Sequence, residues 1–324
     1  MSRKGPASPV ETGIDDEIRA AFGVMPEPLS LHAPLPALRS AVWSTLRETV
    51  VVDRHLPRAV KEAMGVAVSA ANRCAYCVDA HALALHATGA GDVEVAQRHH
   101  RLDRLDPQAR ELISWAARSG RAGPPGDRAP CDREAVPEAI GTVLCFHYVN
   151  RLVTILLAPT LLPFGGSPLR PAVLRIAAAL LRWRVEPQGP AAPMPASAMP
   201  AHLGWATSTP AIFRAFAALD AAAATAASFL QPATRARLDA VLSAWDGTDP
   251  PIGRTWLDEA STAVSAEDRP AFRLMLLAAL APHRVVTSDL DAVRGQDSES
   301  SDPLAVLAFA SFAAARRISQ WWVL

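Results

Sequence analysis

The stretch EAMGVAVSAANRCAYCVDAH, residues 62–81, places one carboxylate, two thiols and one imidazole close together in the chain. Cys74 and Cys77 are separated by two residues, and His81 follows one helical turn later. Only two other cysteines occur in the whole chain. Two thiols at this spacing near the start of a helix can close a disulfide, and the positive end of the helix dipole stabilises a thiolate. The pattern therefore indicates redox chemistry.

The same stretch predicts two helices with a short break between them. Apolar residues recur at helical spacing as far as Ala71, and Asn72–Arg73 interrupts them. A new helix is expected from about Cys74. Within it, Cys74, Cys77 and His81 lie on one face, so that His81 can take a proton from Cys77.

Glu62 is expected on the preceding helix, where it can return to orient His81 as a carboxylate does in a catalytic triad. Burial in a helical core raises the pKa of a thiol, so a base and the helix dipole are needed to offset that effect. The predicted catalytic residues are therefore Cys77, Cys74, His81 and Glu62.

The composition favours packed helices and gives no sign of a polyanionic partner. The 324 residues are half hydrophobic, and 32 basic side chains balance 32 acidic ones. With no net charge, neither nucleic acid nor an anionic membrane is an expected partner. No segment of about four to eight residues alternates cleanly between apolar and polar residues, so no strand is predicted. The expected fold class is all-α and multihelical.

The chain shows no segment that directs it to a membrane or out of the cell. The N-terminal MSRKGPASPVETGIDDE lacks the apolar core of a secretory signal. The longest apolar run, Leu152–Phe164, is interrupted by Pro159 and Pro163 and is too short for a simple span. We expect a cytoplasmic protein, and in a reducing compartment a C-x-x-C pair is more often catalytic or metal-binding than structural.

A proline-rich segment predicts a division of the chain into two lobes. Residues 185–202 contain five prolines, which favour an extended linker. The sequence before it, residues 13–184, holds the cysteine motif and is the expected catalytic lobe. The sequence after it, residues 203–324, is the expected second helical lobe.

The two lobes resemble each other weakly. In Pro137–Leu152 and Pro303–Ile318 the proline, an alanine, a phenylalanine and an arginine recur at one offset. The segment expected to lie opposite the motif, Arg235–Trp256, has no cysteine or histidine. A tandem duplication whose second copy is degenerate and carries no active-site residues accounts for this pattern.

The motif resembles a known family. Glutamate, eleven residues, C-x-x-C, three residues and histidine is the pattern of the alkylhydroperoxidase D branch of the carboxymuconolactone decarboxylase superfamily. The D-P-x-x-R segment at Asp106–Arg110 and a helix closing with Asn150–Arg151 are also similar to that family. The resemblance covers about residues 20–165.

This resemblance implies an all-helical fold, homo-oligomeric assembly as a trimer or hexamer, and no cofactor. It implies a peroxidase that reduces organic hydroperoxides through a dithiol–disulfide cycle. The electron donor would be a dithiol reductant such as a lipoyl-like or thioredoxin-like protein.

The resemblance also implies a role for each residue of the motif. Cys77 would be the thiolate that attacks the peroxide, Cys74 the resolving thiol, and Glu62 and His81 the proton relay. Tyr76 stands where the best-known members of the family carry a histidine. Because a phenol is not a base near neutral pH, a shortened relay is expected.

Other interpretations of the same residues are open. A cofactor-free decarboxylase of the carboxymuconolactone type would have no use for a vicinal dithiol. A non-catalytic redox sensor or scaffold would use the disulfide as an assembly switch, and two small buried thiols can also be purely structural. A zinc site would need a fourth ligand beside Cys74, Cys77 and His81. The candidates for that ligand are His86, His99, His100, Cys131 and Cys145.

Overall fold

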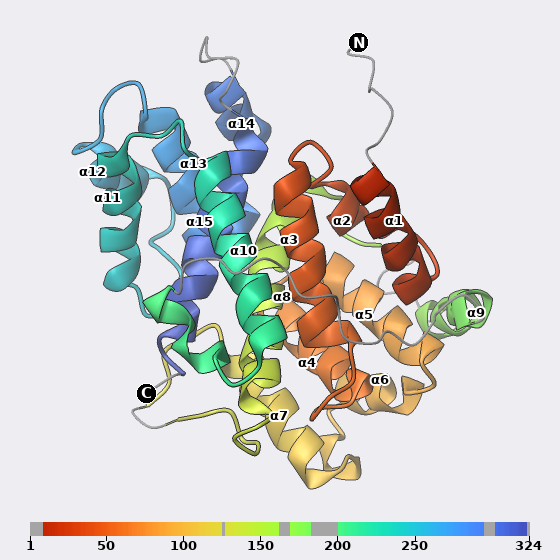
Figure 1. Ribbon diagram of the computed structural model, residues 1–324. Helices are drawn as coiled ribbons and strands as arrows, with labels where there is room; N and C mark the ends of the chain where they lie inside the picture. Colours follow the sequence, from red (N-terminus) through yellow and green to blue (C-terminus); the bar gives the residue numbers. More distant parts are fainter. Residues whose placement is uncertain (1–8, 125–126, 162–168, 183–199, 295–301, 323–324) are drawn as a thin grey trace.

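The protein is all-helical in the residues described by its computed structural model (Figure 1). The described residues are 9–124, 127–161, 169–182, 200–294 and 302–322. No strand occurs among them, which confirms the predicted fold class. The α-helices of the first half are α1 (Pro9–Phe22), α2 (Glu27–Ser30), α3 (Pro36–Leu46), α4 (Arg58–Ala71), α5 (Ala75–Ala87), α6 (Gly91–Arg98), α7 (Pro107–Arg118), α8 (Val136–Leu156) and α9 (Arg170–Arg182). Those of the second half are α10 (Pro210–Ala226), α11 (Pro232–Ser243), α12 (Thr255–Ser261), α13 (Arg269–Leu280), α14 (Thr287–Arg294) and α15 (Pro303–Ser319). Shorter turns are the π-helical η1 (Arg47–Val51) and the 3-10 helices η2 (Leu102–Arg104), η3 (Ala201–Ala206) and η4 (Pro282–Arg284).

The predicted break in the cysteine motif lies between α4 and α5. Arg73 adopts a left-handed backbone conformation with φ 59°, which reverses the chain after α4. The N–H of Cys74 then donates to the carbonyl of Ser69 at 2.9 Å, a bond that closes the end of α4. Cys74 is also the N-cap of α5, so its side chain lies at the positive end of that helix.

The start of α7 shows the same agreement between local sequence and structure. The Asp106 carboxylate accepts hydrogen bonds from the backbone N–H groups of Gln108 and Ala109, and Pro107 occupies the first turn. Both features are typical of a helix N-terminus. By contrast, α8 does not end with Asn150–Arg151 and continues to Leu156.

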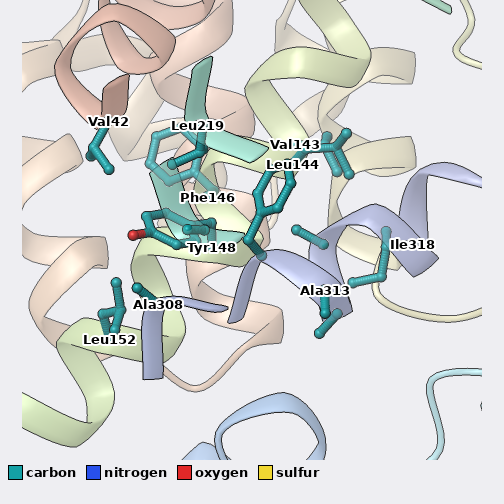
Figure 2. Packing of buried hydrophobic residues seen from close by; sticks show 14 of the residues in the cluster. Val42, Val143, Leu144, Phe146, Tyr148, Leu152, Leu219, Ala308, Ala313 and Ile318 are labelled. Carbon is teal, nitrogen blue, oxygen red and sulfur yellow. The ribbon is translucent and has the colours of Figure 1, made fainter. Parts of the chain in front are cut away.

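Helix α8 forms the centre of the molecule. It is apolar and long enough to cross a membrane, alone among the described helices, yet 78% of its apolar window is buried by other helices, as in the core helix of a globular protein. Figure 2 shows Phe146 and Tyr148 of α8 in the same buried hydrophobic cluster as Leu219 of α10 and Ala308 and Ala313 of α15. Burial of this apolar surface is the main force that holds the two halves together.

The two halves share this one core. Helix α10 packs on α3, and α15 packs on α8, so helices far apart in the sequence lie side by side (Figure 1). Thr45 Oγ1 donates to the carbonyl of Ala215 at 3.3 Å across the same boundary. The predicted linker lies outside the described residues as far as position 199, and η3 already begins at Ala201. The lobe boundaries themselves stay a prediction.

The packing favours a different internal correspondence from the one expected from sequence. Helix α13 packs on α15 as α4 packs on α8, and α14 follows α13 after the short η4 as α5 follows α4. On this packing, a duplication would place the end of α13 and the start of α14 opposite the cysteine motif. The segment Arg235–Trp256, chosen by sequence, instead forms most of α11, the loop after it and the first two residues of α12.

A buried histidine fixes the segment around α2. His32 is 1% exposed, its Nδ1 lies 2.8 Å from the carbonyl of Pro28, and its Nε2 lies 2.9 Å from the hydroxyl of Tyr148. Neutral imidazole satisfies both contacts, with Nδ1–H donating to Pro28 and Nε2 accepting from Tyr148. Burial lowers the pKa of His32 from 6.5 to about 4, although the bond to Pro28 opposes that shift.

Acid should therefore weaken the fold through His32. The pKa of His32 is lower in the folded protein than in the unfolded chain. Its contribution to the free energy of unfolding is therefore complete above pH 6.5 and is lost as the pH falls towards 4. At pH 5 the loss from this residue should be about 2 kcal/mol of unfolding free energy. Urea unfolding at pH 7.5 and pH 5 should show a smaller loss for His32→Gln than for the wild type, whereas the exposed-site control His99→Gln should behave as the wild type. Equal losses in His32→Gln and the wild type would contradict this assignment.

Candidate active site

The hairpin of α4 and α5 brings the predicted carboxylate and imidazole together. Glu62 is fully buried, and its Oε2 accepts a hydrogen bond from His81 Nδ1 at 2.6 Å. Its Oε1 accepts from Arg58 Nε at 3.1 Å. Burial alone would raise the pKa of Glu62, but His81 and Arg58 outweigh it and the net pKa is lowered. Glu62 is therefore an ionised partner for His81.

The bond to Glu62 leaves one nitrogen of His81 for chemistry. With Nδ1–H donating to the carboxylate, neutral His81 carries its free lone pair on Nε2. The ring packs edge-on against Phe146, with centroids 4.4 Å apart. A Cβ at Gly65 would come within 2.2 Å of the Phe146 ring, so a glycine at this position of α4 is what allows Phe146 to lie against His81.

The two thiols form a hydrogen-bonded pair. Both are buried, Cys74 at 3% and Cys77 at 2% exposed, and both are free cysteines. The hydrogen bond from the Cys77 thiol, together with that from the Cys77 backbone N–H, lowers the pKa of Cys74 in spite of its burial. Burial raises the pKa of Cys77 well above its usual range, and the neighbouring Cys74 adds to that effect. The hydrogen bonds from Cys77 therefore favour the thiolate on Cys74 over the thiolate on Cys77.

The two cysteines line different cavities. Cys77 and His81 line an apolar cavity of about 290 Å³, whereas Cys74 lines a wider groove of about 980 Å³ formed largely by α4, α5, α6 and α7. A substrate in the cavity therefore meets Cys77 and His81, and a molecule in the groove meets Cys74. The apolar wall of the cavity includes Phe22, Met25, Leu29, Val42, Leu46, Leu83, Phe146 and Val149.

Tyr76, between the cysteines, has a structural contact. Its hydroxyl donates to Glu27 Oε2 at 3.0 Å, which ties α2 to α5 at the edge of the apolar cavity. Burial and the bond to Glu27 raise the pKa of Tyr76. The phenol is therefore neutral and serves to hold the cavity wall.

The remaining candidates lie outside the thiol pair. His147 is buried, with Nδ1 3.1 Å from Asn72 Nδ2 and Nε2 3.0 Å from Ser119 Oγ, which is the environment of a core histidine. Cys145 lines the apolar cavity, but burial raises its pKa to about 12. Cys131 is half-buried, and burial raises its pKa to about 11. In the described part of the chain, no group of three or more His, Cys, Asp or Glu side chains is arranged to hold a metal ion.

Sequence reasoning missed Arg58. Its Nε binds Glu62, its two terminal nitrogens donate to the carbonyl of Ala21, and its guanidinium lies 5.5 Å from the Phe22 ring centroid. A basic residue four positions before Glu62 on one helix was the signal that could have identified it.

Comparisons with known proteins identify the family of this chain. The model of the Carboxymuconolactone decarboxylase family matches residues 40–118, which include the whole motif. The chain is 38% identical over 312 residues to the alkyl hydroperoxide reductase Rv2159c of Mycobacterium tuberculosis, covering 94% of this chain and 88% of that protein. No solved structure is significantly similar to the chain. The chain therefore belongs to the carboxymuconolactone decarboxylase family.

Proposed function

We propose that the protein is a thiol-dependent peroxidase that reduces organic hydroperoxides through a Cys74–Cys77 dithiol–disulfide cycle. The observation that carries this proposal is the hydrogen-bonded thiol pair whose Cys77 lines an apolar cavity together with a Glu62-bound His81. The name of the relative that spans almost the whole chain, an alkyl hydroperoxide reductase, supports the same activity.

The first step forms a sulfenic acid on Cys77. The thiol pair ionises by giving one proton to His81 Nε2, and Glu62 stabilises the resulting imidazolium. The proton that remains can move along the hydrogen bond between the sulfurs, which transfers the negative charge from Cys74 to Cys77. The Cys77 thiolate then attacks the terminal oxygen of the hydroperoxide, the O–O bond breaks, and the alkoxide takes the proton from His81 and leaves as an alcohol.

The second step forms the disulfide. The Cys74 sulfur attacks the Cys77 sulfur, the S–O bond breaks, and the hydroxide leaves with the Cys74 proton as water. One hydroperoxide and two thiols thus give one alcohol, one water and one disulfide. The N-cap position of Cys74 favours this step because it stabilises the attacking thiolate.

A dithiol reductant completes the cycle from the other side of α5. Cys74 lines the wide groove and not the apolar cavity. A lipoyl-like or thioredoxin-like dithiol can therefore attack its sulfur from the groove without entering the apolar cavity. Separate access would let the alcohol leave while the reductant docks. A cytoplasmic homo-oligomer, as expected from the sequence and the resemblance, belongs to the same proposal.

A steady-state assay tests the activity. Cumene hydroperoxide has an apolar group suited to the cavity, and dithiothreitol can replace the protein reductant. We expect catalytic formation of cumyl alcohol by the wild type and none by the Cys74→Ser, Cys77→Ser double variant. A redox sensor would instead be oxidised once without turnover, and a decarboxylase would leave the hydroperoxide intact.

A further inference from the structure

A polar cavity lies where the two halves of the chain meet. Its volume is about 150 Å³, and neither motif cysteine lines it. It adjoins the groove of Cys74, with which it shares Ala71, Arg73 and Ala117. The first half contributes Arg73, the end of α7 and part of α8. The second half contributes residues from the loop after α11 and from the end of α13 to η4. We name this space the junction cavity.

The lining of the junction cavity is rich in arginine. Arg73, Arg118, Arg121 and Arg151 line it, and Asp249 is the one carboxylate among the described lining residues. Such a set of planar, permanently charged donors is typical of sites that bind oxyanions.

Two of these arginines have carboxylate partners of their own. Arg73 binds Asp249 at 2.9 Å, and Arg118 binds Asp127 at 3.3 Å. Arg121 lies close enough to the exposed Asp246 for the two charges to attract each other. The fourth arginine, Arg151, is the one whose positive charge these carboxylates do not balance.

Arg151 is 7% exposed and has no carboxylate partner among the described residues. Its Nε donates to the carbonyl of Ala279 and its Nη1 to that of His147, while its guanidinium lies 5.9 Å from the Trp245 ring. These two carbonyl oxygens accept hydrogen bonds from Arg151 but do not balance its charge. A buried cation without a counter-ion is costly, so this site is best satisfied by an anion.

The neighbouring Asn150 adds an unused donor. It is 1% exposed, its Oδ1 accepts from Ser69 Oγ at 3.2 Å, and its Nδ2 has no acceptor in the structure. Asn150 lines the same cavity as Arg151. A buried N–H without a partner costs about 1–3 kcal/mol, which a bound oxyanion would recover.

The backbone around the cavity is also unusual. Arg73 has φ 59° at the end of α4, a position where glycine is the usual residue and where a side chain costs about 1 kcal/mol or more. Gly247 has φ 96°, and a Cβ there would lie 2.2 Å from the carbonyl oxygen of Gly120. The halves thus meet by close backbone packing, and Arg73 at its strained position lines both the junction cavity and the groove of Cys74.

We propose that the junction cavity binds a small oxyanion of the phosphate class, held by Arg151, Asn150 and Arg73. Inorganic phosphate is the simplest ligand of this class. Neither half forms this cavity alone, because residues of both halves line it. The second half lacks the reactive residues of the motif, and anion binding would be its contribution to the protein.

Thermal unfolding of the full-length protein tests the proposal, with sodium phosphate compared with sodium chloride at matched ionic strength. We expect phosphate to raise Tm in a saturable way and to bind with one-to-one stoichiometry by calorimetry. Arg73→Gly should fold, because it relieves the left-handed strain, and should bind phosphate about tenfold more weakly. Arg294→Ala, which removes an exposed arginine on α14, is the matched control and should bind as the wild type does.

A second variant makes the test independent of Arg73. Asn150→Asp places a carboxylate beside Arg151, so the protein should become insensitive to phosphate. An equal effect of phosphate and chloride on the wild type would overturn the proposal. So would unchanged phosphate binding in both Arg73→Gly and Asn150→Asp.

Discussion

Replacing Cys77 with serine should abolish hydroperoxide turnover, with a loss in kcat/KM of about 10³-fold or more. Cys77 is the thiol that shares the apolar cavity with His81, and serine is far too weakly acidic to replace a thiolate there. Cys74→Ser should behave differently. It keeps the attacking thiol but lacks the resolving one, so a single round of attack should leave a sulfenic acid on Cys77.

A sulfenate-specific dimedone probe followed by peptide mass spectrometry distinguishes the two variants. We expect a labelled Cys77 in Cys74→Ser and no labelled motif cysteine in Cys77→Ser, while Cys131→Ser, which alters a thiol outside the pair, should turn over as the wild type. The test is demanding because the hydrogen bonds within the pair favour the thiolate on Cys74. A sulfenate trapped on Cys74 in Cys77→Ser would reverse the two roles.

Replacing Glu62 with glutamine should reduce kcat/KM by about 10²-fold, the usual contribution of a positioned acid–base pair. The neutral amide cannot stabilise the imidazolium that forms when the thiol pair ionises. Because the imidazole then accepts the proton less readily, the thiolate forms only when the thiol pair loses a proton to solvent at higher pH, so the pH of half-maximal activity should move upward by about one unit. His81→Gln, which removes the base, should be at least as damaging.

A second buried glutamate provides the control for Glu62→Gln. Glu138 is fully buried, binds Lys61 Nζ at 3.1 Å and accepts the backbone N–H of His55 at 2.8 Å, but does not line the cavity. Glu138→Gln should lower the unfolding free energy without moving the pH–rate profile. A pH–rate profile of Glu62→Gln that matches the wild type would show that Glu62 has only a structural role.

The parts of the structure that depend on local sequence were predictable. The break at Asn72–Arg73, the helix start at Cys74 and the N-cap at Asp106 follow from short-range capping and spacing, and the structure has all three. The approach of Glu62 to His81 was also predictable, because two helices joined by so short a turn must pack as a hairpin.

The access routes to the site were not predictable from the sequence. The apolar cavity combines residues as distant as Met25, Leu83 and Val149, which only tertiary packing brings together. The same holds for the junction cavity, whose lining comes from both halves of the chain. The similar packing of α4 on α8 and of α13 on α15 was not predictable either, since alanine-rich helices of similar composition align with one another in several registers. The four-residue spacing between Arg58 and Glu62 on one helix could have predicted their contact. The role of Arg58, however, depends on the geometry of Glu62.

The most direct test of the central claim is a stoichiometric oxidation of the fully reduced protein by cumene hydroperoxide. The account predicts one cumyl alcohol per chain and the loss of two hydrogens on the peptide that contains both Cys74 and Cys77. That peptide should regain its reduced mass after addition of a dithiol. A disulfide that links either residue to Cys131 or Cys145, or alcohol formation that leaves both motif thiols reduced, would contradict it.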